Sequence, residues 1–148
     1  MKNLALFGGG KTILKKVKPH NSIGKEEVNI VNKVMKTGRL SEFYGTWGNG
    51  FYGGKYVQKF EKSCSNFFKV KYAISVNSWT SGLITAVGAL DINPGDEIIV
   101  SPWSMCASAT SIIHWNAIPI FADIDQETFN LDPKDVEKKI NKRTKAIM

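Results

Sequence analysis

The chain has 148 residues, of which 43% are apolar and 22% charged, and its formal net charge is +7. This composition predicts a globular protein of one domain rather than a disordered chain, and no apolar run approaches the ~20 residues that cross a bilayer. We therefore expect no membrane partner. The N-terminal apolar block, Leu4 to Phe7, is too short for a signal sequence, so we expect a cytoplasmic protein. The two basic clusters, residues 11–18 and 138–145, contain no aromatic residue for base stacking, so we expect no nucleic-acid binding.

Two amphipathic helices are predicted in the first half of the chain. Apolar residues recur at helical spacing within residues 21–40, with acidic residues near the start and Lys36 and Gly38 at the end. A second apolar stripe runs through residues 56–68. Between them, residues 41–55 are dominated by glycine and aromatic side chains, and we expect a mobile loop that lines a pocket or a subunit contact.

From residue 72 onward, predicted strands alternate with predicted helices. Strands are expected at residues 72–76, 95–101, 117–124 and 144–148, and helices at residues 81–90, 105–115 and 131–141. Asp132 suits the N-cap of the last helix and Pro133 its first position. This alternation predicts parallel strands joined by helical crossovers, and therefore an α/β fold. Because the chain stops inside the last predicted strand, we expect the front part of a longer protein.

Two local patterns resemble ligand sites but lack the required context. Residues 48–53 match G-x-G-x-x-G, but no buried strand precedes them, as a dinucleotide site requires. The acidic residues between Asp123 and Asp132 lack the central glycine and terminal Glu of a calcium loop. We expect a polar turn that leads into the Asp132 cap.

The histidines and cysteines do not form a recognisable catalytic or metal-binding set. His20 and His114 stand alone, and Cys64 and Cys106 have no partner at metal-ligand spacing. We expect two free thiols, no metal site, and a helix-terminal or partly buried position for His114. The absence of G-x-S-x-G removes support for serine hydrolase chemistry.

The sequence NSWTSG, residues 77–82, lies where the first predicted parallel strand ends and a helix begins. Ligands of open α/β sheets bind at this edge, and the first turn of a helix offers unpaired N–H groups to a phosphate. Ser78, Thr80 and Ser81 add short hydroxyl groups. Two compatible interpretations remain open, a capping turn with Ser78 or Thr80 as the N-cap and an anion-binding corner.

Several sequence blocks follow one another in a characteristic order from about Ile23 onward. They are a Gly-rich loop and helix, then NSWTSG, NPGDE, a block that starts at Pro102, PIFADID and TKAI. Together they resemble the DegT/DnrJ/EryC/StrS-type sugar aminotransferases. The resemblance implies the three-layer α/β/α large domain of a fold-type-I transferase that uses pyridoxal 5′-phosphate (PLP). Residues 1–22 would then form an N-terminal arm, and residues 23–148 the N-terminal portion of that domain, truncated at its C-terminus.

The resemblance also assigns cofactor-binding residues. The PLP phosphate would lie at Ser78, Trp79 and Thr80, held mainly by backbone N–H groups. Trp79 stands where the family usually has glycine, so its side chain must find room, for example against the Gly-rich loop. Counting from Pro102 places Cys106 where the family often has an aromatic residue that stacks on the cofactor ring. A sulfur atom can also pack on such a ring.

The reaction implied by the resemblance moves an amino group from glutamate or glutamine onto the keto group of a nucleotide-activated sugar or a cyclitol. Such enzymes are homodimers with active sites at the subunit boundary, and Trp47, Phe51 and Tyr52 are candidates for substrate or dimer contact. The aldimine-forming lysine and the acidic partner of the pyridine nitrogen are expected downstream of Met148. Residues 1–148 alone should therefore not catalyse transamination.

Two other functions stay open. Some members of the family lack the lysine and act as sugar dehydratases or regulators that bind PLP without a covalent bond. A phosphate-binding α/β module without PLP is the other alternative. In a longer sequence, Lys at the aldimine position would favour an aminotransferase and His a dehydratase. Absorbance of bound cofactor would distinguish both from a module without PLP.

Overall fold

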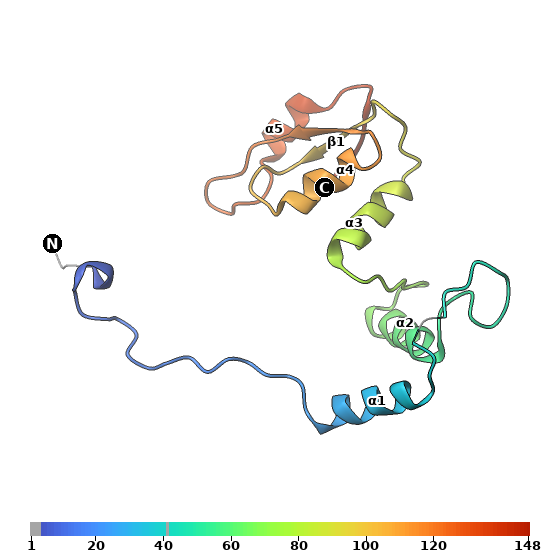
Figure 1. Ribbon diagram of the computed structural model, residues 1–148. Coiled ribbons are helices and arrows are strands. Elements are labelled where there is room, and N and C mark those ends of the chain that lie inside the picture. Colours follow the sequence, from blue (N-terminus) through green and yellow to red (C-terminus); the bar gives the residue numbers. More distant parts are fainter. Residues whose placement is uncertain (1–3, 41) are drawn as a thin grey trace. The chain divides into compact units, whose positions relative to one another are not determined.

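The computed structural model describes residues 4–40 and 42–148 (Figure 1). Residues 1–3 of the predicted arm and Ser41 of the predicted loop lie outside the described residues. The chain divides into two compact units, Met1–Gly54 and Lys55–Met148. No helix within the described ranges combines the length and the apolar character that a bilayer crossing requires.

The first unit contains one regular helix, α1 (Lys25–Lys36), as predicted. Its start is capped because the Gly24 amide donates a hydrogen bond of 2.7 Å to the Glu27 carboxylate, and its end is followed by Gly38 in a left-handed conformation with φ 67°. Within the predicted N-terminal arm, a short 3₁₀ turn, η1 (Ala5–Phe7), is followed by residues without regular secondary structure. No residue of α1 is buried.

The second unit begins with α2 (Lys55–Phe68), also as predicted, and continues through the alternating elements. These elements are α3 (Trp79–Gly88), β1 (Glu97–Val100), α4 (Cys106–Ile113), β2 (Ile118–Phe121), α5 (Pro133–Lys139) and β3 (Thr144–Ile147). Asp132 caps α5, since its Oδ1 accepts a hydrogen bond of 2.9 Å from the Lys134 amide, and Pro133 occupies the first helical position. Both predictions for this helix start are confirmed.

The three strands form one parallel sheet in the order β2-β1-β3. β1 lies in the centre and all four of its residues are buried, which fits the apolar run expected of a central parallel strand. Ile99 lies opposite Ile120 of β2 on one side and opposite Ile147 of β3 on the other. The register with β3 shifts between Glu97 and Ile98. The predicted α/β fold with a parallel sheet is confirmed.

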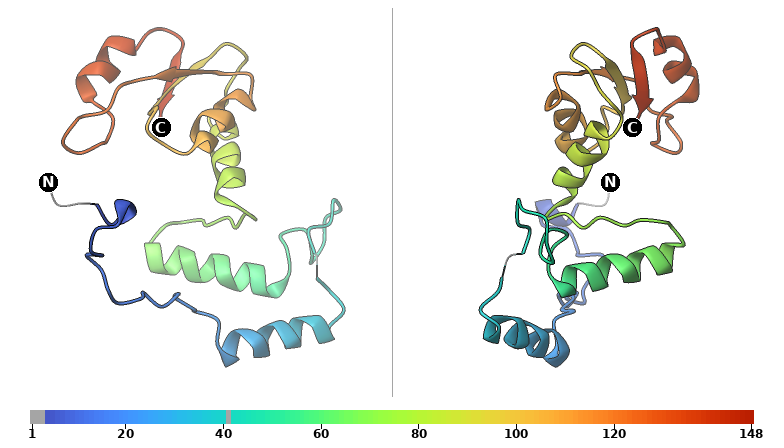
Figure 2. Two further views of the ribbon diagram at one scale, coloured as in Figure 1. Left: turned by 60° about the vertical axis from the view of Figure 1, so that its left-hand side comes forward. Right: turned by 90° about the vertical axis from the view of Figure 1, so that its right-hand side faces the viewer.

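Helices cover both faces of this sheet (Figure 2). Ile98 and Val100 point to one face, where they pack with Val87 of α3 and Ile112 of α4. Ile99, one position out of phase, packs on the opposite face with residues that include Val136 of α5. The alternation of side chains along β1 therefore builds the core of a three-layer α/β/α arrangement.

The prediction of a strand at residues 72–76 is wrong. The segment is extended but belongs to no strand, and Tyr72, Ile74 and Val76 are exposed on it. A strand needs a neighbouring strand for its backbone hydrogen bonds. No strand in the part of the chain that the structure describes pairs with residues 72–76. The segment therefore lacks the backbone hydrogen bonds of a sheet, although its apolar residues alternate as in a strand.

The acidic segment after β2 is a polar turn, as expected. Oδ1 of Asp125 accepts hydrogen bonds from the amides of Glu127 and Thr128, at 3.1 and 2.8 Å, and from the Thr128 hydroxyl at 2.9 Å. These hydrogen bonds hold the pKa of Asp125 below its ordinary value, those from Thr128 having the largest effect. The carboxylate is thus used to close the turn.

Candidate functional site

Ser78 begins α3 as its N-cap. Its backbone is extended, with φ −157° and ψ 161°, and its Oγ accepts a hydrogen bond of 3.1 Å from the Ser81 amide. The Ser78 hydroxyl donates in turn to Ser81 Oγ at 3.0 Å. The predicted capping turn is confirmed, with Ser78 rather than Thr80 as the cap.

Two amide groups at the start of α3 remain available to a ligand. The first amides of a helix have no acceptor inside the helix, and the described residues place no acceptor opposite those of Trp79 and Thr80. Because Ser78 satisfies only the amide of Ser81, the cap and a bound anion would use different donors. Capping and anion binding are therefore compatible at this helix start.

The Trp79 side chain is 75% exposed and turns toward the next turn of its own helix. A Cβ atom added to Gly82 would lie 3.8 Å from Trp79 Cε3, so the indole finds its room beside this glycine. A phosphate group fits the start of α3, because two free amides, nearby hydroxyl groups and the positive end of a ten-residue helix converge there.

A carboxylate of α2 fixes the segment in front of α3. Glu61 Oε1 accepts hydrogen bonds from the Ser75 amide at 2.8 Å and from the Ser75 hydroxyl at 2.9 Å. Ser75 lies three residues before the cap, so Glu61 helps to set the direction from which the chain enters α3. Sequence reasoning missed this contact, since nothing in the pattern of α2 distinguishes Glu61 from other polar residues of the helix.

Cys106 is the first residue of α4 and is exposed. Both Cys106 and Cys64 are free thiols, as predicted. Trp103, in the preceding loop, packs toward Phe129 with ring centroids 6.3 Å apart. The placement of Cys106 against a cofactor ring stays a prediction.

The far end of α3 is fixed to α4 by Trp115. The indole Nε1 donates a hydrogen bond of 2.8 Å to the Ile84 carbonyl, and the ring lies directly against Gly88, where a Cβ atom would collide with it. His114, beside it, is the C-cap of α4, which confirms its predicted helix-terminal position. Val87, near the C-terminal end of α3, also packs with Ile112 of α4. The C-terminal end of α3 is therefore held by α4, whereas Ser78 and Trp79 at its N-terminal end are exposed.

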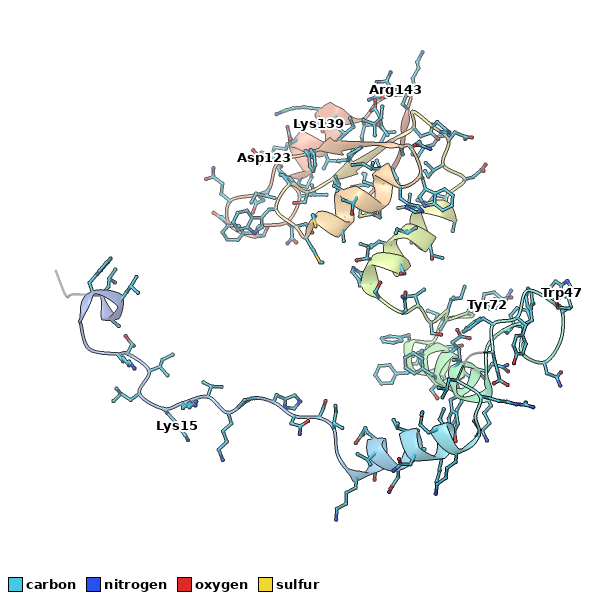
Figure 3. All side chains as sticks on the ribbon, in the orientation of Figure 1. Lys15, Trp47, Tyr72, Asp123, Lys139 and Arg143 are labelled. Carbon is cyan, nitrogen blue, oxygen red and sulfur yellow. The ribbon has the colours of Figure 1, made fainter. Side chains whose placement is uncertain are left out.

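The remaining perturbed carboxylates serve the scaffold. Buried Glu97, at the start of β1, accepts hydrogen bonds from Asn141 Nδ2 at 2.6 Å and from Arg143 Nε at 2.7 Å, and it forms an ion pair with Arg143. These hydrogen bonds, first that of Asn141, hold the pKa of Glu97 below its ordinary value. Figure 3 labels Arg143 beside this sheet.

Asp135 of α5 plays a similar part. Its Oδ2 accepts a hydrogen bond of 2.7 Å from the Asp123 amide and pairs with Lys139 at 2.9 Å (Figure 3). The amide of Asp123 is the main reason that the pKa of Asp135 lies below its ordinary value. Within the described ranges, no group of three or more His, Cys, Asp or Glu side chains is suited to hold a metal ion.

The aromatic loop of the first unit is packed on itself. The rings of Trp47 and Phe51 stack with centroids 4.2 Å apart, and Tyr52 meets Phe51 edge to face at 5.0 Å. Gly50 and Gly53 are buried because the rings of Tyr44 and Phe43 cover them. The loop thus presents a preformed aromatic surface, of which Trp47 is 76% exposed.

Comparison with known proteins identifies close similarities. The sequence model of the DegT/DnrJ/EryC1/StrS aminotransferase family matches residues 21–148. The chain is 42% identical over 126 residues to the spore coat polysaccharide biosynthesis protein SpsC of Bacillus subtilis, covering 85% of this chain and 30% of that protein. It is 43% identical over 95 residues to GDP-perosamine synthase of Vibrio cholerae, covering 64% of this chain and 26% of that protein.

A solved structure agrees with these matches. Spr1654 of Streptococcus pneumoniae, described as a sugar aminotransferase and solved in its PLP form, superposes with a TM-score of 0.75 at 27% identity. The match covers 85% of this chain and 29% of that chain. The chain therefore spans between 26% and 30% of the length of these three proteins.

Proposed function

We propose, because the chain belongs to the DegT/DnrJ/EryC1/StrS aminotransferase family, that the protein acts as a PLP-dependent aminotransferase. Its substrate would be a nucleotide-activated keto sugar or a cyclitol, and its amino donor glutamate or glutamine. The observation that carries this proposal is the pair of available amides at the start of α3, within the part of the chain that matches the family. The names of SpsC and GDP-perosamine synthase support the sugar class.

The main contribution of the start of α3 would be to bind and orient a phosphate. The amides of Trp79 and Thr80 would donate to its oxygens, and the helix dipole would stabilise its negative charge. Charge-assisted hydrogen bonds of this kind are shorter and stronger than neutral ones. When bound, PLP supplies an electron sink for the carbon that gains or loses the amino group.

Glu61 and Cys106 would act around this phosphate site. Glu61 is a positioning residue, because its two hydrogen bonds from Ser75 hold the chain that leads into the cap. Cys106, exposed at the start of α4, would pack its sulfur on the cofactor ring. The resemblance places the reactive lysine and its acidic counterpart beyond Met148, so we expect residues 1–148 by themselves to lack transaminase activity.

Substitution of Trp79 tests the phosphate site through its backbone. Trp79→Pro removes one amide donor, and proline is tolerated at the first position of a helix. The extended conformation of Ser78 is also the one that a following proline favours. We expect a loss of PLP affinity of about 10- to 100-fold, since a hydrogen bond to a charged group contributes about 1.5–3 kcal/mol.

Trp79→Ala is the matched control, because it removes the indole and keeps the amide. Equilibrium dialysis of the protein against PLP should show affinity within a few-fold of the parent for this variant. Equal PLP affinity of the parent and Trp79→Pro would place the phosphate elsewhere and remove the central observation of the proposal.

Amino transfer itself is tested on a longer protein that contains residues 1–148 and the expected reactive lysine, with ¹⁵N-labelled glutamate or glutamine and a panel of nucleotide-linked keto sugars and keto cyclitols. Appearance of the label in an amino sugar or amino cyclitol, followed by mass spectrometry, is the expected result. PLP binding with loss of a hydroxyl group and no label transfer would instead indicate a dehydratase. Absence of PLP binding would indicate a phosphate-binding module.

The aromatic surface of the first unit would contact the sugar substrate or a second subunit of a homodimer. Trp47, Phe51 and Tyr52 are already ordered by one another, so little side-chain entropy would be lost on contact. In a longer, active protein that contains residues 1–148, Trp47→Ala with Phe51→Ala should raise KM for the sugar or shift the dimer toward monomer in sedimentation. Phe67→Ala, which removes an 80% exposed aromatic residue of α2, is the control and should change neither.

A further inference from the structure

We propose that the N-terminal arm, residues 1–22, binds the surface of a membrane that contains anionic lipids. The sequence-based expectation of no membrane partner rested on the lack of an apolar run that spans a bilayer. Adsorption to the surface needs no such run, only cationic side chains near the lipid headgroups and apolar ones that enter the boundary layer.

The net charge of the chain is concentrated in this arm. The arm contains five lysines and no acidic residue. The other 126 residues carry 15 basic and 13 acidic side chains, so they contribute a net charge of only +2 out of +7. The basic cluster at residues 138–145 lies in the part of the chain where acidic residues balance it, whereas the charge of the arm is unopposed.

Large apolar side chains of the arm are exposed next to its lysines. Leu6, Leu14 and Val17 are 86%, 86% and 81% exposed, and Phe7 and Ile13 are nearly as open. Monomeric proteins rarely leave such side chains together in water unless they meet a partner. None of these five side chains is buried, so all of them are accessible to a surface that binds the neighbouring lysines.

The apolar and cationic side chains share one local surface. Ile13 and Val17 line an open hollow on the arm together with Lys15, Lys16 and Lys18. Figure 3 shows Lys15 projecting from the extended chain. Since lysine can place its alkyl stem along an apolar boundary and its ammonium group in the headgroup layer, this mixture suits a lipid interface.

A nucleic acid is a poorer fit to the same residues. The arm contains no arginine, and Phe7 is its one aromatic residue apart from His20, so it offers few groups for base stacking or for bidentate phosphate contacts. A nucleic acid would also leave Ile13, Leu14 and Val17 without an apolar partner. The interleaving of aliphatic and cationic side chains therefore favours lipid.

Vesicle co-sedimentation of the full chain tests the proposal. We expect binding to vesicles with roughly 30% phosphatidylserine and little binding to pure phosphatidylcholine. Replacing Lys11, Lys15, Lys16 and Lys18 with Gln should weaken binding on the order of several hundred-fold, since each lysine contributes about fivefold. The matched control replaces Lys134, Lys138, Lys142 and Lys145 with Gln and should change binding less than about tenfold, because these lysines would not lie next to the lipid headgroups and the attraction falls off within a Debye length.

A second variant separates lipid from other polyanions. Ile13→Ser with Leu14→Ser and Val17→Ser keeps every charge and should weaken vesicle binding about tenfold or more. An oligouridine probe should bind the chain more weakly than anionic vesicles and should not distinguish this variant from the parent. Because none of these side chains is buried, the variants should keep the thermal unfolding curve of the parent.

Three results would overturn the proposal. They are equal binding to neutral and anionic vesicles, an equal loss in the control lysine variant, and unchanged vesicle binding of the serine variant. A tighter complex with oligouridine than with the vesicles would instead assign the arm to nucleic acid. None of these outcomes bears on amino transfer, because the arm lies outside residues 21–148 except at its last two positions.

Discussion

The unit Lys55–Met148 holds all buried apolar side chains of the described residues, whereas in the unit Met1–Gly54 the buried positions within those residues are Gly50 and Gly53. Yet α1 of the first unit is as regular a helix as α4 of the second. A helix makes its backbone hydrogen bonds within its own segment, so its geometry does not require a neighbouring strand, although most of its stability comes from the packing of its amphipathic face. Burial is a separate property that depends on a partner.

Residues 72–76 extend the same comparison to a strand. Their alternating apolar pattern is as clear as that of many strands, but a strand takes its hydrogen bonds from a neighbour. Without that neighbour among the described residues, the segment stays extended and Glu61 satisfies the Ser75 amide instead. The apolar side chains of α1 and of residues 72–76 are thus left exposed.

The largest effect is expected from two isoleucines in equivalent helical settings. Ile112→Ala in α4 removes a fully buried side chain, and we expect a loss of about 2–5 kcal/mol in the free energy of unfolding. Ile30→Ala in α1 removes a side chain that is 44% exposed, and we expect a change within about 0.5 kcal/mol. Denaturant titration followed by circular dichroism measures both.

An equally large loss for Ile30→Ala would break the comparison, because it would show that the apolar face of α1 is packed in solution. A shift of the unfolding midpoint with protein concentration would then identify a second copy of the chain as the partner.

A smaller effect is expected from two glycines of α3. A side chain at Gly88 would collide with the ring of Trp115, so Gly88→Ala should destabilise the protein by about 1–3 kcal/mol. At Gly82 the nearest atom would be Val76 Cγ2 at 3.4 Å, an ordinary contact, so Gly82→Ala should stabilise by about 0.5–1 kcal/mol through helix propensity.

The same titration compares the two variants. If Gly88→Ala were as stable as Gly82→Ala, the attachment of α3 to α4 through Trp115 would be looser than the structure shows, and the N-terminal end of α3 would not be held in place by it.

Sequence reasoning was strongest where the signal is local. Asp132 followed by Pro133, the helical stripe of residues 56–68, and the run Glu97–Val100 each specify their structure within a few residues. The local pattern also predicted an N-cap at Ser78 or Thr80, and the structure has Ser78. Contacts between distant residues left no such trace, as for Glu61 with Ser75, Trp115 with Ile84, and Glu97 with Asn141.

The candidate site was predicted only in part, for a physical reason. Its donors are backbone amides, and any sequence that starts a helix supplies them, so composition alone does not distinguish a cap from an anion site. The order of blocks along residues 21–148 favours the anion site only through the resemblance to the family, so the phosphate site stays a prediction. The position of Cys106 relative to α3 depends on packing that no local pattern encodes.

Acid should destabilise the second unit through Glu97. Hydrogen bonds from Asn141 and Arg143 lower the pKa of Glu97 in the folded state, so its stabilising contribution is complete above the unfolded value near 4.5 and is lost as pH falls below it. Glu97→Gln should lower Tm by about 5–10 °C at neutral pH, and the two Tm curves should converge as the pH falls through the lowered pKa of Glu97.

Glu27→Gln is the control for this prediction. The Gly24 amide also holds the pKa of Glu27 below its ordinary value, but Glu27 belongs to the unit without a core. Its substitution should leave the acid dependence of the cooperative transition unchanged. Parallel Tm curves for the parent and Glu97→Gln from neutral pH through the acid range would show that Glu97 is not the group that titrates.

The smallest effect on global stability is expected from the cap of α1. Glu27→Ala removes the acceptor of the Gly24 amide, and because α1 buries nothing, the loss should appear as local fraying. Amide hydrogen exchange within α1 should accelerate about two- to fivefold while the unfolding midpoint stays constant.

Asp132→Ala removes the corresponding cap of α5, which carries Val136 into the core, so it should cost about 1 kcal/mol of global stability. A global loss from Glu27→Ala equal to that from Asp132→Ala would mean that α1 unfolds together with the core, and that its exposed apolar face is coupled to the second unit after all.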